Sequence, residues 1–145
     1  MARASTKTET FSVRLDPQTR YLAELAARSQ GRSLANFIQM AIESALETTK
    51  IETYANRERP IQVRSSEFIN QVWDVDEPER LVKLALTYPE LLSFEEQLLY
   101  KKLRDKYELP EHQGPLDLGG FDWTRIHGEW TEFKRGVQAA TTSGS

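Results

Sequence analysis

Apolar and polar residues alternate strictly near the start of the chain. The apolar side chains are Phe11, Val13 and Leu15, and the polar ones between and before them are Thr10, Ser12 and Arg14. A period of two over several residues is the pattern of a half-buried β-strand, with one face in a core and the other in solvent. We therefore expect a strand over residues 8–15.

Two helices are expected after this strand, because apolar residues then recur at steps of three and four. The first spans 17–30, where Asp16 can act as N-cap and Pro17 suits the first helical position. Gly31 is expected to end it, since a glycine adopts a positive φ at little cost. Ser33 is expected to cap the second helix, whose apolar face is Leu34, Phe37, Ile38, Ala41, Ile42 and Ala45.

A single strand leaves its backbone N–H and C=O groups without a ladder partner. About 40 residues is also close to the lower limit for an independent hydrophobic core. Both problems disappear if two copies of the chain pair their strands antiparallel and pack their helices together, so we expect a homodimer or a dimer of dimers. The expected dimer core is Phe11, Val13, Leu15, Leu22, Leu25, Leu34, Phe37, Ile38, Ala41 and Ile42.

The order of a short strand, a helix, Gly31-Arg32-Ser33 and a second helix resembles the ribbon-helix-helix family of bacterial DNA-binding proteins. The resemblance covers about residues 8–48, and we assign 8–50 to this domain. It implies that the paired strands form a ribbon that enters the major groove of DNA. The remainder of the chain resembles no family that we recognise.

The resemblance implies two groups of DNA contacts. The polar face of the ribbon would read base edges, which Arg can do through bidentate bonds to guanine and Ser or Thr through single bonds. Those readers are Thr10, Ser12 and Arg14. The start of the second helix would hold a phosphate through free amides and a partial positive charge. The expected phosphate contacts are Lys7, Arg32, Ser33 and Leu34.

A helix-turn-helix is the competing interpretation of residues 18–46, because Ala27 and Gly31 have the spacing of that motif. Arg32 and Ser33, however, occupy positions where an apolar residue is usual. That motif would also leave the strand unexplained, so we prefer the ribbon.

The other segments are assigned from their composition and periodicity. Residues 1–7 are expected to be a disordered basic arm, 51–64 a polar linker and 139–145 a disordered tail. Apolar residues at helical spacing predict a small all-α domain over 65–138, with a loop around 110–120 and a capping box formed by Ser93 and Glu96. The expected fold is thus mainly α, a ribbon-helix-helix unit followed by a helical domain.

The amino-acid composition restricts the possible classes of protein further. The 145 residues include no cysteine, which excludes disulfides and thiolate metal sites and suits a cytoplasmic protein. The net charge is −3, but residues 1–50 carry seven Lys and Arg against five Asp and Glu, whereas 51–145 carry twelve against seventeen. Residues 1–50 can therefore bind DNA despite the acidic total. No membrane segment or signal peptide is evident, and a bacterial, nucleoid-bound location is expected.

Candidate chemistry in the second half is sparse. Asp74, Asp76, Glu77 and Glu79 are acidic residues at an expected helix start, where the helix dipole favours them. His112 and His127 show no metal-ligand spacing, and no nucleophile motif or phosphate loop is present. We expect neither an enzyme nor a cofactor or metal. Trp73, Trp123 and Trp130 suit a core better than a binding surface.

The sequence thus favours a sequence-specific transcriptional regulator that acts as a repressor. Its expected partners are double-stranded DNA and a second copy of the same chain. Two alternatives stay open. One is an antitoxin-like adaptor whose segment 65–138 binds a protein partner. The other is an accessory DNA-binding protein of plasmid partition or conjugation, in which the C-terminal half drives assembly on DNA.

Overall fold

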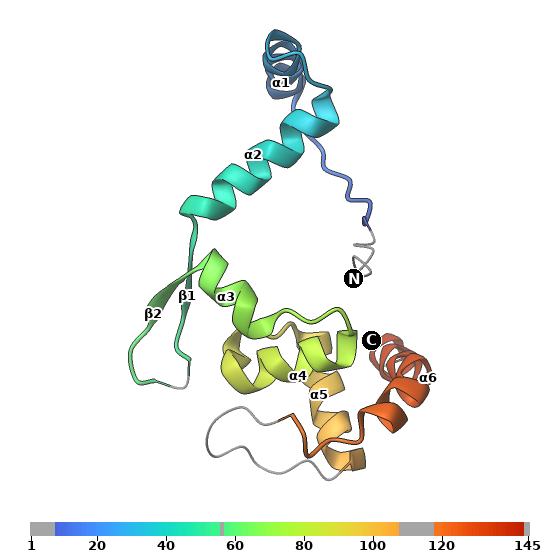
Figure 1. Ribbon diagram of the computed structural model, residues 1–145. Coiled ribbons are helices and arrows are strands. Elements are labelled where there is room, and N and C mark those ends of the chain that lie inside the picture. The colour runs from blue at the N-terminus through green and yellow to red at the C-terminus, as the bar shows by residue number, and fades with distance from the viewer. Residues whose placement is uncertain (1–7, 56, 108–117, 144–145) are drawn as a thin grey trace, which may run out of the picture. The chain divides into compact units, whose positions relative to one another are not determined.

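The computed structural model of the chain describes residues 8–55, 57–107 and 118–143. The chain divides into two compact units, Met1–Ala45 and Leu46–Ser145. It is mainly helical, as expected, with one small antiparallel sheet (Figure 1). The elements in order are α1 (Pro17–Ser29), α2 (Leu34–Thr48), β1 (Lys50–Thr53), β2 (Ile61–Arg64), α3 (Ser65–Val72), α4 (Glu77–Thr87), the 3₁₀-helix η1 (Pro89–Leu91), α5 (Phe94–Tyr107) and α6 (Trp123–Thr142).

The first two helices start and stop where the sequence predicts. Asp16 caps α1, because its Oδ1 accepts a hydrogen bond from the Thr19 amide at 3.0 Å. Gly31 has a φ of +66° and follows the C-cap of α1. The Arg32 amide donates back to the carbonyl of Ala27 at 2.9 Å, which completes a Schellman turn. Local sequence therefore determines the geometry of the turn between α1 and α2.

The prediction of a linker over 51–64 is wrong, because this segment contains a β-hairpin. Strands β1 and β2 pair antiparallel, with Ile51 opposite Val63 and Thr53 opposite Ile61. These four side chains share one face of the pleat, where Val63 and Thr53 are buried. The C-terminal unit is therefore helical with a small sheet rather than all-α.

A carboxylate holds the end of β1 in place. Glu90, in η1, accepts hydrogen bonds from the Thr53 hydroxyl and from the amides of Tyr54, at 2.6 Å, and Ala55, at 3.2 Å. Ala55 has a φ of +46°. Burial alone would raise the pKa of Glu90, but the bonds from Thr53 and the two amides hold it below the ordinary value of 4.5.

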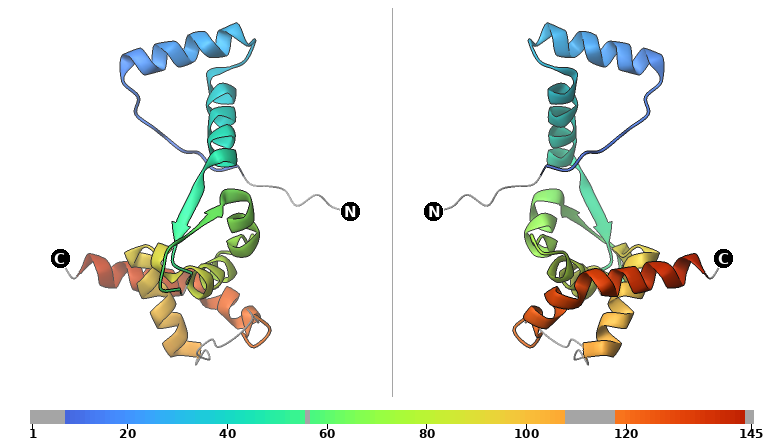
Figure 2. Two further views of the ribbon diagram at one scale, coloured as in Figure 1. Left: turned by 90° about the vertical axis from the view of Figure 1, so that its left-hand side faces the viewer. Right: turned by 90° about the vertical axis from the view of Figure 1, so that its right-hand side faces the viewer.

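The main core of the C-terminal unit lies between α4, α5 and α6, which group together in both views of Figure 2. Its buried members are Leu81, Val82, Ala85, Leu92, Leu99, Leu103, Ile126, Trp130 and Val137. A smaller cluster beside the hairpin contains Val63, Val72 and Tyr88, where the rings of Tyr88 and Phe68 stack with centroids 4.6 Å apart. The unit therefore has a core of its own.

Two further predictions about this unit can be compared with the structure. The capping box is confirmed: the Glu96 amide donates to the Ser93 hydroxyl, and the Ser93 amide donates to a Glu96 carboxylate oxygen at 2.7 Å. The expected tail from residue 139 is wrong for its first part, because α6 continues to Thr142. Hydroxyls of Thr141 and Thr142 donate to the carbonyl of Gln138, which supports this last turn.

None of the helices in the described part of the chain combines the length and apolar character that a membrane span requires.

Candidate functional site

The segment 8–16, which was predicted to include a strand, forms neither helix nor strand in the single chain. This departs from the prediction for a physical reason: a strand needs a second strand for its backbone hydrogen bonds, and no other described segment offers one to it. The expected base-reading side chains of Thr10, Ser12 and Arg14 are all exposed. Lys7 and the arm 1–7 lie outside the described residues.

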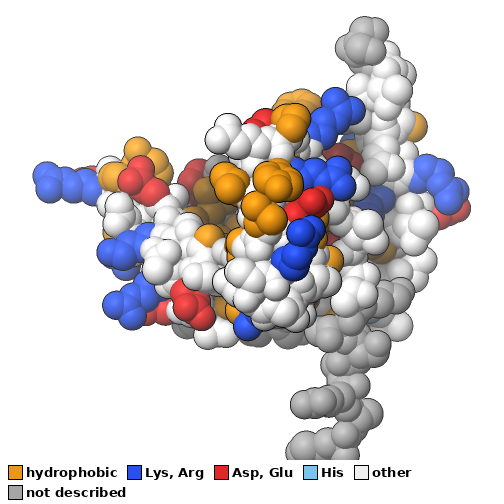
Figure 3. Space-filling view, turned by 90° about the horizontal axis from the view of Figure 1, so that it is seen from above, with side chains coloured by type: hydrophobic (Ala, Val, Ile, Leu, Met, Phe, Trp, Pro, Cys, Tyr) orange, Lys and Arg blue, Asp and Glu red, His pale blue; other side chains and the backbone are white. Residues whose placement is uncertain are grey.

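The apolar residues of the same segment also face solvent. Phe11 is 83% exposed, Val13 56% and Leu15 41%. In a strand these three would share one face. Figure 3, which views the molecule from above, shows hydrophobic side chains at the surface with Lys and Arg side chains next to them.

Helices α1 and α2 leave much of their apolar surface open as well. Of the predicted core positions on them, Leu34, Phe37 and Ile38 are partly buried, whereas Leu22, Leu25, Ala41 and Ile42 are exposed. Ala27 is the one buried side chain among residues 8–45, with 2% of its surface exposed. One copy of this unit therefore has no closed hydrophobic core in the region that the structure describes.

The start of α2 is where most of the expected phosphate contacts lie. The Ser33 hydroxyl caps the helix by accepting from the Asn36 amide at 3.2 Å. The Leu34 amide has no acceptor among the described residues, and Arg32 is exposed beside it. Arg32, Ser33 and Leu34, three of the four expected phosphate contacts, are thus adjacent at the N-terminal end of a helix.

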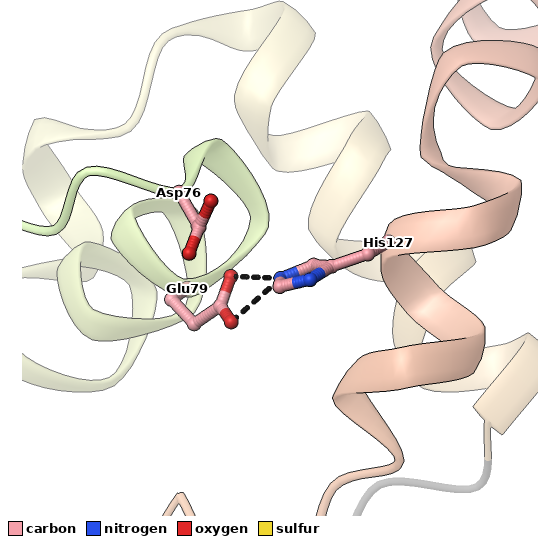
Figure 4. A group of neighbouring side chains, drawn as sticks. All are labelled: Asp76, Glu79 and His127. Carbon is pink, nitrogen blue, oxygen red and sulfur yellow. Dashed lines mark hydrogen bonds and ion pairs between the residues drawn. The ribbon is translucent and has the colours of Figure 1, made fainter.

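In the C-terminal unit, α4 and α6 bring three side chains together that sequence reasoning treated separately (Figure 4). Asp76 and Glu79 come from the start of α4 and His127 from α6. The Nε2 atom of His127 lies 2.7 Å from Oε1 and 2.8 Å from Oε2 of Glu79. This hydrogen bond raises the pKa of His127, with a smaller contribution from the charge of Asp76.

No signal in the sequence could have found this group. His127 is 48 positions from Glu79, and neither spacing nor periodicity relates two residues on different helices. The histidines show no metal-ligand spacing along the chain. In space, however, the ligand atoms of Asp76, Glu79 and His127 lie within 4.8 Å of one another.

A second charged group links α5 to α6 around Glu129. Its carboxylate accepts from the Tyr107 hydroxyl at 2.6 Å and pairs with Lys106 at 2.7 Å and Arg125 at 3.4 Å. The bonds from Lys106 and Tyr107 lower the pKa of Glu129 to about 2. Desolvation and the bond to Glu129 raise the pKa of Tyr107 to about 12. Every charge in this group has a partner, which indicates a structural link between helices.

The tryptophans divide between core and surface. Trp130 is buried, as expected, and its indole N–H donates to Glu77 at 3.1 Å. Trp73 is 54% exposed, and the guanidinium of Arg80 lies 5.0 Å from its ring centroid. Both tryptophans line a pocket of about 250 Å³. Its other walls are Phe68, Ile69, Val72, Glu77, Arg80, Leu81, Leu84, Glu96 and Leu99.

Comparison with protein-family models, with curated proteins and with solved structures finds no match to this chain. Its function is therefore inferred from its own residues.

Proposed function

We propose that two copies of this chain pair through residues 8–48 to form a ribbon-helix-helix unit that binds a specific DNA site and regulates transcription. In this proposal the two segments 8–15 form an antiparallel ribbon. The four helices of the pair, α1 and α2 from each copy, pack beneath it. In such a dimer the separate chains are much less stable than the pair, so the stability of the fold depends on protein concentration.

The exposed apolar surface of residues 11–46 is the observation that carries the proposal. Phe11, Val13 and Leu15 lie on a segment without backbone partners, and Leu22 and Ile42 remain more than half exposed on well-capped helices. Burying a side chain of this size contributes about 1.5–3 kcal/mol. A second copy offers the same surface and a matching strand, and so supplies both missing partners at once.

The polar positions fit DNA on the opposite face. When Phe11, Val13 and Leu15 turn inward, the period of two turns Thr10, Ser12 and Arg14 outward. A two-stranded ribbon has the width that the major groove admits, and the dimer presents each reader twice. Arg32, Ser33 and the Leu34 amide would contact phosphates and so set the position of the ribbon without reading sequence.

The folded C-terminal unit favours one of the two alternative roles over the other. A core of nine buried residues suits a module that assembles copies on DNA, as in partition or conjugation accessory proteins. It suits less well a toxin-neutralising segment that gains its structure on binding. In either case residues 8–48 would remain the part that contacts DNA.

The ribbon can be tested with single cysteines, because the natural chain has none. In an antiparallel ribbon with two-fold symmetry, one residue of the strand lies directly opposite the same residue of the partner strand. The separation of their Cα atoms is one that a disulfide can bridge. Cysteines are introduced in turn at residues 11–14 of the full chain. Ser29→Cys, at the exposed end of α1, is the matched control. Covalent dimers are measured by non-reducing electrophoresis after mild oxidation.

The proposal predicts that one of the four positions forms a covalent dimer faster than its neighbours and faster than the control. That position would also identify the register of the ribbon. Equal, slow cross-linking at all five positions would contradict the pairing of the strands.

A further inference from the structure

Three potential metal ligands converge between α4 and α6, in a part of the molecule with no role in the DNA proposal (Figure 4). They are the carboxylates of Asp76 and Glu79 and the imidazole of His127. Asp76 is the N-cap residue of α4 and Glu79 lies in its first turn, so one short segment presents both carboxylates. His127 lies on α6 and faces them.

We propose that Asp76, Glu79 and His127 bind a divalent transition-metal ion, with zinc as the reference case. One imidazole nitrogen and two carboxylate oxygens form a ligand set that suits zinc, nickel or copper better than magnesium or calcium, which prefer oxygen alone. Asp76 and His127 are exposed and Glu79 is partly buried, so water can complete the coordination.

The side chain of Asp76 is available for this role. An aspartate at an N-cap ordinarily accepts a hydrogen bond from an amide of the first turn, but here no side-chain cap bond forms. Within the described part of the chain, the hydrogen bonds of Asp76 involve its backbone: its amide donates to Asp74, and its carbonyl accepts from the Arg80 amide at 3.1 Å. Among the described residues its carboxylate therefore has no partner.

The surrounding cations do not neutralise the pair of carboxylates. Lys83 pairs with Asp74 at 2.7 Å, and Lys134 pairs with Glu77 at 2.8 Å. The Arg80 side chain lies over Trp73 and donates to the Asp74 carbonyl. Two carboxylates, Asp76 and Glu79, thus share one imidazole, and a divalent cation would supply the missing positive charge.

The geometry needs only small side-chain movements. Ligand atoms about 2 Å from a tetrahedral zinc ion are roughly 3.3 Å apart. Here the Nε2 atom of His127 is 2.7 Å from Glu79, and the ligand atoms of all three residues lie within 4.8 Å of one another. The ion would separate the histidine from the glutamate slightly and draw the aspartate inward. These movements require rotation of surface side chains and no change in the helices.

A bound ion would join the start of α4 to the N-terminal part of α6, two helices of the main core. Because the ion binds the folded C-terminal unit and not its unfolded form, it would raise the stability of that unit as its concentration rises. This inference stands apart from the DNA proposal, and its experiment requires no DNA.

The test is a calorimetric titration of zinc chloride into the metal-free full-length protein. The variants are His127→Gln and Asp76→Asn, and His112→Gln is the control that removes the other histidine of the chain. Circular dichroism verifies that each variant is folded. Copper(II) provides a second measurement, because Trp123 lies with its ring centroid 6.3 Å from that of His127 and its fluorescence would be quenched by a copper ion there.

We expect one zinc ion per chain in the wild type and in His112→Gln. In Asp76→Asn, zinc binding is expected to weaken at least roughly tenfold, because the loss of a residue that merely supports a metal ligand already has an effect of that size. In His127→Gln, zinc binding is expected to be abolished. Copper quenching should disappear in His127→Gln as well. Wild-type protein that binds no zinc, or binding that His127→Gln leaves unchanged, would overturn the proposal.

Discussion

Arg14 is the residue whose role in DNA recognition is most specific, because its guanidinium can form two hydrogen bonds to one guanine. We predict that Arg14→Ala weakens binding to the cognate site by roughly 1–3 kcal/mol and relaxes base preference at the contacted position. Arg28→Ala removes an equal charge at the exposed end of α1 and should have a much smaller effect. Fluorescence anisotropy with cognate and mutated DNA measures both. Equal losses in the two variants would indicate that Arg14 contributes charge alone.

Glu90 gives the C-terminal unit a defined response to acid. Its pKa is lower when folded than the ordinary 4.5, so the stability it contributes is complete above that value and is lost as the pH falls through the folded pKa. Chemical unfolding at neutral and at acidic pH should show this loss in the wild type. Glu90→Gln should be less stable at neutral pH and should lose less on acidification. Glu52→Gln, an exposed change on β1, is the control and should behave as the wild type does.

Individual residues also show where sequence reasoning stops. Asp16, Gly31 and Ser93 could be assigned from the chain because each acts on amides or turns within a few positions. The contact between Glu79 and His127 depends on how α4 packs against α6, and the hydrogen bonds of Glu90 depend on how η1 lies against the hairpin. No local pattern contains that information.

Two glycine substitutions with opposite expected effects on stability test a glycine in a turn and a glycine inside a helix. Gly31 has a positive φ, so Gly31→Ala should destabilise the turn between α1 and α2 by roughly 1–2 kcal/mol. Gly128 lies inside α6, with open space where a Cβ would be. Gly128→Ala should therefore stabilise its unit by about 0.5–1 kcal/mol. Thermal unfolding measures both changes. A stabilising effect of Gly31→Ala would contradict the turn described for that residue.

At the scale of elements, helices were easier to predict than strands. The two helices expected after residue 16 are present, because their apolar residues repeat at helical spacing over several turns and because Asp16, Gly31 and Ser33 mark their ends. The hairpin was missed although Ile51 and Thr53, then Ile61 and Val63, alternate with polar residues. Each strand has only four residues, and the charged connection between them, which contains a proline, has the composition of a linker.

A substitution that destabilises one unit of the molecule should leave the function of the other unit intact. Leu103 is fully buried in the core of the C-terminal unit, and Leu103→Ala should lower the stability of that unit by roughly 2–5 kcal/mol. Leu91→Ala, at a position 37% exposed, should cost less. Binding of one dimer to one DNA site should survive the Leu103 change, since residues 8–48 make the proposed contacts. If Leu103→Ala abolished binding to a single DNA site as well as destabilising the C-terminal core, this would argue against a DNA-binding unit confined to residues 8–48.

The central claim is that the dimer of residues 8–48 reads a particular DNA sequence. Selection from a random DNA pool by the purified full-length protein, followed by a salt titration of the enriched site, tests it most directly. We predict enrichment of a short repeated or two-fold symmetric site, with affinity that falls as salt rises. No enrichment, or binding indifferent to sequence, would contradict the claim and would leave residues 8–48 as a dimerisation device.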